Sequence, residues 1–330
     1  MIGPIPADGQ PLSDADCAAI LRDYDLAPDD WRLDRFQFKG GGIVLNFRRI
    51  WFRSATPRRA GKPPMVTLPP KGETHVNVVF GDYQIPFHDV ALHRHSCAYV
   101  RERQPNRIVL LGDIIDFPSI SRFARNPYHH AEVQKSLDVA YGVIADLRDA
   151  APSAEIVFLP GNHEERLQRY IIQNASELHG VHRVGEITPV LSIQHLLRLD
   201  DLAVTWVSDD FGEWPQSRLL LSPYFAATHG WIVRRGAGNS ARATLEKMGH
   251  AVIMGHVHTG AIIWRTIHEP NGKHTMHCGV ENGTMCQIRG GQGFASYPDW
   301  ANLFHEIEVK SDGTYIPPRQ ITWLNGRLFC

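Results

Sequence analysis

Five short apolar runs constrain the fold more than any other feature of this chain. They recur between residues 76 and 254, at 76–80, 107–111, 155–159, 224–227 and 251–254. Their apolar residues are nearly continuous rather than alternating, which is typical of strands buried on both faces. Helix-length segments separate them, at 89–103, 131–149, 164–175 and 237–249. This alternation predicts an α/β fold in which a mostly parallel sheet is covered by helices.

The last third of the chain has a different pattern. Residues 261–323 alternate more between apolar and polar, and glycine and proline interrupt them. Such alternation is typical of antiparallel strands with one exposed face. We therefore expect an α/β sandwich in which these C-terminal strands form a second sheet.

The first 72 residues differ in composition from the rest. Residues 13–34 hold seven aspartates and predict a short acidic helix. Two Pro-Pro pairs near the end of the region predict a stiff, turn-rich connection. We expect a small N-terminal α+β module with its linker at 1–72, followed by one larger domain at 73–330.

A basic, aromatic segment follows the acidic helix. Residues 35–62 carry eight lysines and arginines and no acidic residue. Three glycines separate the runs 35–38 and 43–52, which predicts a hairpin. Such a ribbon could lie along a phosphate backbone with its aromatic rings stacked on bases. Alternatively, the aromatic rings form a small core and the cations neutralise the acidic helix, and the near-neutral charge of the chain favours this second interpretation.

Composition excludes several classes of protein. With 43% hydrophobic and 21% charged residues, the chain is not disordered throughout. A net charge of −1 produces no overall field that would recruit nucleic acid or a membrane, and no apolar run is long enough to span a bilayer. The five cysteines are scattered and never spaced as C-x-x-C, which argues against a disulfide framework. Without a signal-peptide pattern at the N-terminus, we expect a cytoplasmic protein.

Each of the five apolar runs is followed almost at once by a polar cluster that contains glycine. In open α/β sheets, ligands bind beyond the carboxyl ends of the strands, and glycine permits the sharp turns found there. Five clusters in the same position predict one shared site. The side chains expected at this rim are Asp82, Asp113, Asn162, His229, His256 and His258.

The residue types in these clusters indicate a metal centre. Oxygen and imidazole ligands without thiolate suit Mn, Fe, Zn or similar divalent ions. Six or seven ligands exceed the four of a tetrahedral zinc site, so they fit two ions bridged by one carboxylate. His256 and His258 lie two residues apart and project to the same side of an extended chain, where each could serve a different ion.

The order and content of the blocks resemble the calcineurin-like metallophosphoesterases, including members from bacteriophages and prophages. The resemblance covers about residues 76–260. It implies a metallophosphoesterase-type α/β/β/α sandwich and a phosphoric ester hydrolase, a phosphatase or phosphodiesterase that uses two divalent metal ions and a metal-bound hydroxide. We expect phosphomonoester or phosphodiester substrates, with nucleotides or nucleic acids favoured.

The same resemblance assigns roles to individual residues. Asp113 would bridge both ions, with Asp82 and His258 on the first ion. The second ion would be held by Asn162, His229 and His256. His163 would stabilise the phosphoryl group or protonate the leaving oxygen, and Asp116 would orient His163.

Two departures from the family pattern affect these expectations. Gln84 stands where most members have histidine, so the first ion is expected to be labile, although Gln84 could equally coordinate as a tolerated variant. His88 could supply the missing imidazole or contact the substrate. Phe117 stands where protein-phosphatase members have a phosphate-gripping arginine, and Arg166, Arg234 or Arg235 could take that role. The Gln84 departure also leaves an alternative function, a nucleic-acid-binding protein whose metal site is structural or vestigial.

Overall fold

The computed structural model describes residues 31–39, 42–49, 66, 68–121, 132–207, 214–268, 272–288 and 298–330. The chain divides into two units, 1–60 and 61–330, which are described separately. The first contains the predicted hairpin, formed by antiparallel strands β1 (Trp31–Lys39) and β2 (Gly42–Arg49). The predicted acidic helix lies outside the described residues. Nucleic-acid binding by residues 35–62 therefore stays a prediction.

A seven-stranded sheet runs through the second unit, in the order β14-β13-β12-β3-β4-β5-β6. Its four parallel strands are β3 (Thr74–Phe80), β4 (Arg107–Leu110), β5 (Glu155–Phe158) and β6 (Val204–Trp206). Its antiparallel edge consists of β12 (Leu303–Lys310), β13 (Arg319–Leu324) and β14 (Arg327–Phe329). The parallel strands β3, β4 and β5 are three of the five runs predicted as strands.

A five-stranded sheet lies against the first, in the order β10-β11-β9-β8-β7. Its strands are β7 (Arg218–Ser222), β8 (Phe225–Thr228), β9 (Ala251–Met254), β10 (Gly260–His268) and β11 (His274–Asn282). Two expectations are corrected here. Strands β8 and β9 belong to this second sheet, and β12 to β14 join the first. The reason is that an apolar run shows that a strand is buried but does not identify its neighbours.

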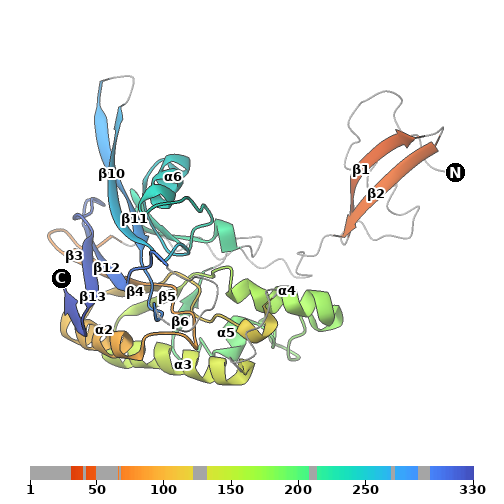
Figure 1. The fold of residues 1–330 in the computed structure, drawn as a ribbon, viewed down its shortest axis with the longest axis horizontal. Helices are drawn as coiled ribbons and strands as arrows, with labels where there is room; N and C mark the ends of the chain where they lie inside the picture. Colours follow the sequence, from red (N-terminus) through yellow and green to blue (C-terminus); the bar gives the residue numbers. More distant parts are fainter. Residues whose placement is uncertain are drawn as a thin grey trace. The chain divides into compact units, whose positions relative to one another are not determined.

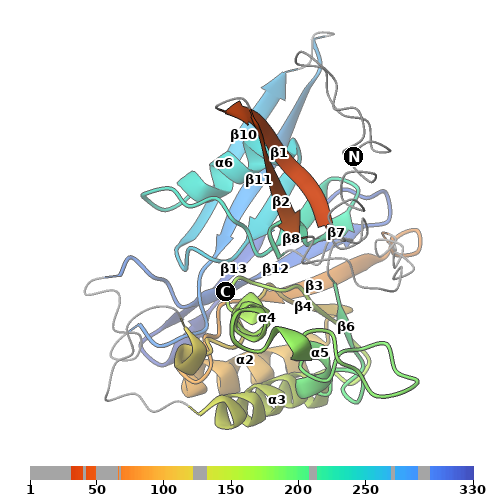
Figure 2. The same cartoon turned by 90° about the vertical axis from the view of Figure 1, so that its right-hand side faces the viewer.

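Helices cover the outer face of each sheet (Figure 1). Against the first sheet pack α2 (Val90–Arg103) and α3 (Val133–Ala150), and against β9 and β11 packs α6 (Asn239–Met248). The remaining helical segments are α4 (Glu164–Asn174), α5 (Ile193–Leu196), and the 3-10 turns η1 (Pro118–Ile120), η2 (Ser176–Leu178) and η3 (Trp214–Gln216). Figure 2 shows α2 and α3 on the side of the first sheet away from β10 and β11. The predicted α/β/β/α sandwich is thus confirmed.

Two cores explain the continuous apolar runs. Val78 and Phe80 of β3 point into the core beneath α2 and α3, whereas Val79 points into the core between the sheets. Adjacent side chains of a strand point to opposite faces, so a strand covered on both sides is apolar at every position. In the described part of the chain, the four cysteines are free thiols, and no helix is both long and apolar enough to cross a membrane.

Candidate metal centre

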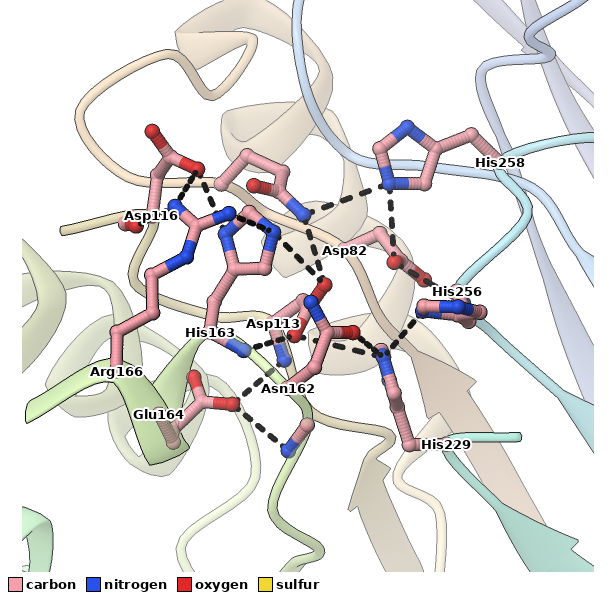
Figure 3. Close-up of polar contacts among 12 residues, drawn as sticks. Asp82, Asp113, Asp116, Asn162, His163, Glu164, Arg166, His229, His256 and His258 are labelled. Carbon is pink, nitrogen blue, oxygen red and sulfur yellow. Dashed lines mark hydrogen bonds and ion pairs between the residues drawn. The ribbon is translucent and has the colours of Figure 1, made fainter. Parts of the chain in front are cut away.

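The ends of five strands, three from one sheet and two from the other, bring the predicted ligands together (Figure 3). Asp82, Asp113 and Asn162 follow β3, β4 and β5 of the first sheet. His229 follows β8, and His256 and His258 follow β9 of the second sheet. The site therefore lies where the carboxyl ends of the parallel strands of both sheets meet.

Strained backbone accompanies these side chains. Non-glycine residues rarely adopt positive φ, and each instance costs about 1–3 kcal/mol. Five site residues do so, namely Asp82 (53°), Gln84 (52°), Asp113 (52°), His256 (71°) and His258 (61°). Strain of this kind persists where the surrounding fold imposes it, and it concentrates at functional sites.

Glycine allows the loops after β4 and β5 to approach each other. Gly112 has φ of 88°, and a Cβ on it would lie 2.5 Å from the Gly161 nitrogen. A Cβ on Gly161 would overlap the Asp113 carboxylate. Neither position can carry a side chain without moving the Asp113 loop, so these glycines are required by the site.

One group of ligand atoms surrounds His229 Nε2. Its ring donates from Nδ1 to the Leu111 carbonyl at 2.7 Å, which leaves a lone pair on Nε2. Facing that lone pair are Asn162 Oδ1 at 3.1 Å, His256 Nδ1 at 3.2 Å and Asp113 Oδ1 at 3.4 Å. Asp113, His229 and His256 each offer one ligand atom, and these atoms lie within 4.8 Å of one another. Acceptor atoms that converge in this way require a proton or a cation between them.

The electrostatics of the cluster show the same requirement. Burial lowers the pKa of His229, but the charges of Asp113 and Asp82 outweigh burial and raise it to about 9. Burial and the neighbouring His229 lower the pKa of His256 to about 4. Burial alone would raise the pKa of Asp113, yet the surrounding histidines hold it well below its usual value. When no cation is bound, a second proton on His229 Nε2 and an ionised Asp113 thus stabilise each other.

A second group of ligand atoms lies on the other side of Asp113. Asp113 Oδ2 accepts a hydrogen bond from Gln84 Nε2 at 3.1 Å, and this nitrogen is 3.4 Å from His258 Nε2. His258 Nε2 in turn lies 3.1 Å from Asp82 Oδ1. Within the described residues, the buried Gln84 Oε1 has no hydrogen-bond partner. This donor set therefore fits a cation that would bind the amide oxygen after the Gln84 side chain turns over.

His163 is held beside Asp113 by two charged side chains. His163 Nδ1 lies 2.6 Å from Asp116 Oδ1, and His163 Nε2 lies 2.8 Å from Arg166 Nη2. Arginine can only donate, so Nε2 accepts and the ring proton is on Nδ1, facing Asp116. Arg166 also donates to the Asp116 carbonyl at 2.6 Å. Of the proposed phosphate or substrate contacts, Arg166 is the one that the structure places beside His163 and Asp116.

His88 and Arg234 are not brought to the cluster. The ring of His88 interacts with the Pro86 backbone and with His93, and burial lowers its pKa. Arg234 lies on the exposed loop before α6, where its guanidinium donates to the Val233 carbonyl. Neither has a contact with the metal-ligand atoms among the described residues.

Sequence patterns did not indicate a role for Glu164, the first residue of α4. It is 2% exposed and accepts four backbone N–H groups, from Asp113 and Gly161 at 2.8 Å, Ile114 at 2.8 Å and Ile115 at 3.2 Å. Burial and the Asp113 charge raise the pKa of Glu164, and these N–H donors oppose the rise. One carboxylate thereby fixes both loops that supply Asp113 and Asn162.

Replacing Glu164 by glutamine is expected to destabilise the domain by about 3 kcal/mol. An amide would present a donor to buried N–H groups, and each buried donor without an acceptor costs about 1–3 kcal/mol. Urea denaturation followed by circular dichroism measures this change. Glu177→Gln on the exposed surface is the matched control and should unfold like the unmodified chain. Equal stability of Glu164→Gln and the control would contradict this role.

Two tryptophans flank the cluster. The Trp214 ring lies 5.4 Å from His229 and 5.5 Å from His256, measured between ring centroids. The Trp300 ring lies 4.5 Å from His258 in an edge-to-face arrangement. Trp214 is thus a fluorescent group beside the atoms that would bind an ion.

Comparison with known proteins gives distant relatives. No family model matches the chain. It is 24% identical over 266 residues to the Gene 54 protein of Mycobacterium phage D29, covering 76% of this chain and 94% of that protein, and 24% identical over 260 residues to the Gene 54 protein of Mycobacterium phage L5, with the same coverage.

Several solved structures are similar to the chain at low sequence identity. Vacuolar protein sorting 29 from Cryptosporidium parvum is 13% identical, with a TM-score of 0.38 over 78% of this chain and 95% of that one. Wild-type Vps29 complexed with Zn²⁺, from Entamoeba histolytica, is 10% identical, with a TM-score of 0.37 over 77% and 96%. Yfce, a phosphoesterase from E. coli, is 12% identical, with a TM-score of 0.30 over 74% and 98%.

Proposed function

We propose that this chain is a metal-dependent phosphoesterase that hydrolyses phosphomonoesters or phosphodiesters, with nucleotides or nucleic acids as its substrates. The observation that carries the proposal is the division of the Asp113 carboxylate between two groups of ligand atoms. Oδ1 faces His229, and Oδ2 faces Gln84. A carboxylate with this surrounding can be shared by two cations, which is the arrangement used in two-metal hydrolysis of phosphate esters.

The ligand sets define what each group could hold. Asn162, His229 and His256 with Asp113 offer two imidazoles, one amide oxygen and a carboxylate, which suit Mn, Fe or Zn. Asp82, Gln84 and His258 with Asp113 form the second set. Divalent ions bound there would polarise the phosphoryl oxygens and lower the pKa of water.

Three further side chains, His163, Asp116 and Arg166, would act on the substrate. His163 Nε2 faces the cluster, 3.5 Å from Asp113 Oδ2, so it is the imidazole atom that would meet a phosphoryl group. Asp116 keeps the proton of the ring on Nδ1, and Arg166 supplies a guanidinium beside Nε2 that suits a phosphate oxygen. Arg166 would orient the ester, and His163 would donate to its leaving oxygen once a second proton is on Nε2 in addition to the one that faces Asp116.

Hydrolysis of two model esters tests the proposal. The purified full chain is incubated with Mn²⁺ and either p-nitrophenyl phosphate or bis-p-nitrophenyl phosphate, and the two rates separate monoesterase from diesterase activity. Turnover should disappear with EDTA and return when Mn²⁺ is restored.

One observation favours a second candidate, a nucleic-acid-binding protein with a structural metal: the Gln84 amide nitrogen already bonds to Asp113. That candidate predicts no turnover of either ester while Mn²⁺ still raises the Tm.

Gln84→His is expected to convert a labile ion into a retained one. A neutral amide oxygen is a weaker donor than imidazole, and Gln84 must first break its bond to Asp113. After extensive dialysis, elemental analysis should find one ion per unmodified chain and two per Gln84→His chain, with at least a tenfold tighter second site, equivalent to about 1.4 kcal/mol. Gln134→His on the exposed face of α3 is the control. Two ions retained by the unmodified chain would contradict this prediction.

A further inference from the structure

Three arginines line one open cavity at the start of α6. Arg234 and Arg235 lie on the loop before the helix, Arg242 lies within it, and all three are exposed. The cavity has a volume of about 290 Å³, and its other lining residues are Asn239, Ala243 and Glu246. None of the three arginines belongs to the metal-ligand cluster.

The cavity has an unbalanced positive charge. Within the described part of the chain, Arg234, Arg235 and Arg242 form no ion pair with a carboxylate, and the Glu246 carboxylate is paired with Arg265 at 3.0 Å. Three guanidinium groups without carboxylate partners favour an anion, and the planar guanidinium matches the oxygens of phosphate in bidentate geometry.

The loop that carries two of these arginines is held in place. The Arg234 N–H donates to Ser240 Oγ at 2.9 Å, and Asn239 Nδ2 donates to the Arg235 carbonyl at 2.9 Å. Gly238 N–H donates to the buried Glu281 carboxylate at 2.7 Å. Because the backbone is already ordered, binding at this loop would cost less conformational entropy.

Glu281 also ties this loop to the metal centre. Its Oε2 accepts from Gly238 and from the Thr259 hydroxyl at 2.5 Å, and Thr259 directly follows His258. The same carboxylate accepts the N–H groups of Ser240 and Ala241 at the start of α6, at 3.0 and 3.1 Å. Those N–H groups are therefore already bonded, and the arginine side chains are what the cavity offers to an anion.

We propose that this arginine pocket, Arg234, Arg235 and Arg242, binds a backbone phosphate of a nucleic-acid strand that has another of its phosphodiesters at the metal centre. The proposal rests on the proposed phosphoesterase function. A single carboxylate, Glu281, fixes both sites, so one ligand that carries several phosphates can engage them together. A nucleic-acid strand has that chemistry, whereas a phosphomonoester has only one phosphate to offer.

The test compares the triple variant Arg234→Ala/Arg235→Ala/Arg242→Ala with the unmodified full chain. Binding of a fluorescein-labelled single-stranded oligothymidylate is measured by anisotropy in EDTA, so that the result does not depend on turnover. The Kd should rise at least about tenfold, and the slope of log K against log salt should become shallower by about 0.7, as expected for the loss of one phosphate contact to a single strand. With Mn²⁺, kcat/KM should fall more for the oligonucleotide than for bis-p-nitrophenyl phosphate.

A variant with the same change of charge serves as the control. Arg94→Ala/Arg101→Ala/Arg327→Ala removes three exposed arginines from α2 and β14, and it should leave the affinity close to that of the unmodified chain. Circular dichroism melting checks that both triple variants are folded.

Three results would contradict the proposal that these arginines bind a backbone phosphate. The first is an equal loss of affinity in the two triple variants. The second is an equal loss of kcat/KM on both substrates, which would place these arginines in the catalytic site itself. The third is a loss of affinity for polyglutamate, in the Arg234→Ala/Arg235→Ala/Arg242→Ala variant, that equals its loss of affinity for the oligothymidylate. That result would indicate an acidic protein as partner. If the unmodified chain hydrolyses no ester, the proposed function is wrong. The binding measured in EDTA still tests whether the arginine pocket binds a nucleic-acid phosphate.

Discussion

Asp113→Asn is expected to weaken the binding of both ions, so that no ion is retained after dialysis, and to lower kcat/KM by about three orders of magnitude, or about 4 kcal/mol of transition-state stabilisation. Asparagine keeps the shape and can still accept the His163 N–H at the Oδ1 position, which Asp113 does at 2.9 Å. It removes the negative charge, and its amide nitrogen would face the ligand group that includes Gln84. Because the histidines hold the pKa of Asp113 well below its usual value, the unmodified chain carries this charge throughout the pH range of an assay.

Two measurements check the loss of the ions. Elemental analysis after dialysis counts the ions. Mn²⁺ should quench the fluorescence of Trp214, whose ring lies 5.5 Å from that of His256, in the unmodified chain but not in Asp113→Asn. A Trp214→Phe chain gives the background from the other tryptophans. Asp138→Asn on the exposed face of α3 is the matched control. Retention of one ion per Asp113→Asn chain after dialysis, as in the unmodified chain, or activity within a few-fold of the unmodified chain, would show that Asp113 is not the shared ligand.

The convergence of the ligands could be predicted from sequence because it depends on topology alone. Parallel strands end at the same edge, so residues that follow them, such as Asp82 and Asp113, must lie close together. The sheet to which each strand belongs could not be predicted. Strand β8 is as continuously apolar as β4, but it pairs with β7 and β9 in the second sheet. Burial on both faces is a local signal, whereas strand pairing is decided by distant residues.

The supporting contacts were missed for a related reason. Glu164 follows His163 in the sequence, and only the folded loops reveal that its carboxylate accepts the N–H groups after β4 and β5. Glu281 is equally hidden on β11, although it joins α6 to Thr259. Both are buried charges satisfied by backbone donors from other elements, and residue type alone does not distinguish them from surface acids.

His163→Ala is expected to lower kcat by two to four orders of magnitude, roughly the contribution of a positioned general acid, while both ions remain bound. His163 supplies no ligand atom to either group, since its ring nitrogens face Asp116 and Arg166. Elemental analysis should therefore give the same metal content as the unmodified chain. His195→Ala, on the short helix α5, is the control and should leave kcat unchanged.

The choice of leaving group separates the two roles proposed for His163. p-Nitrophenolate departs without a proton, whereas phenolate departs much more easily when it is protonated. If His163 protonates the leaving oxygen, His163→Ala should lose more activity on phenyl phosphate than on p-nitrophenyl phosphate. If it stabilises the phosphoryl group instead, both substrates should lose activity equally. Unchanged turnover of both esters would exclude both roles. The Asp116 carboxylate lies 2.6 Å from the His163 ring, and it would then have no catalytic partner to orient.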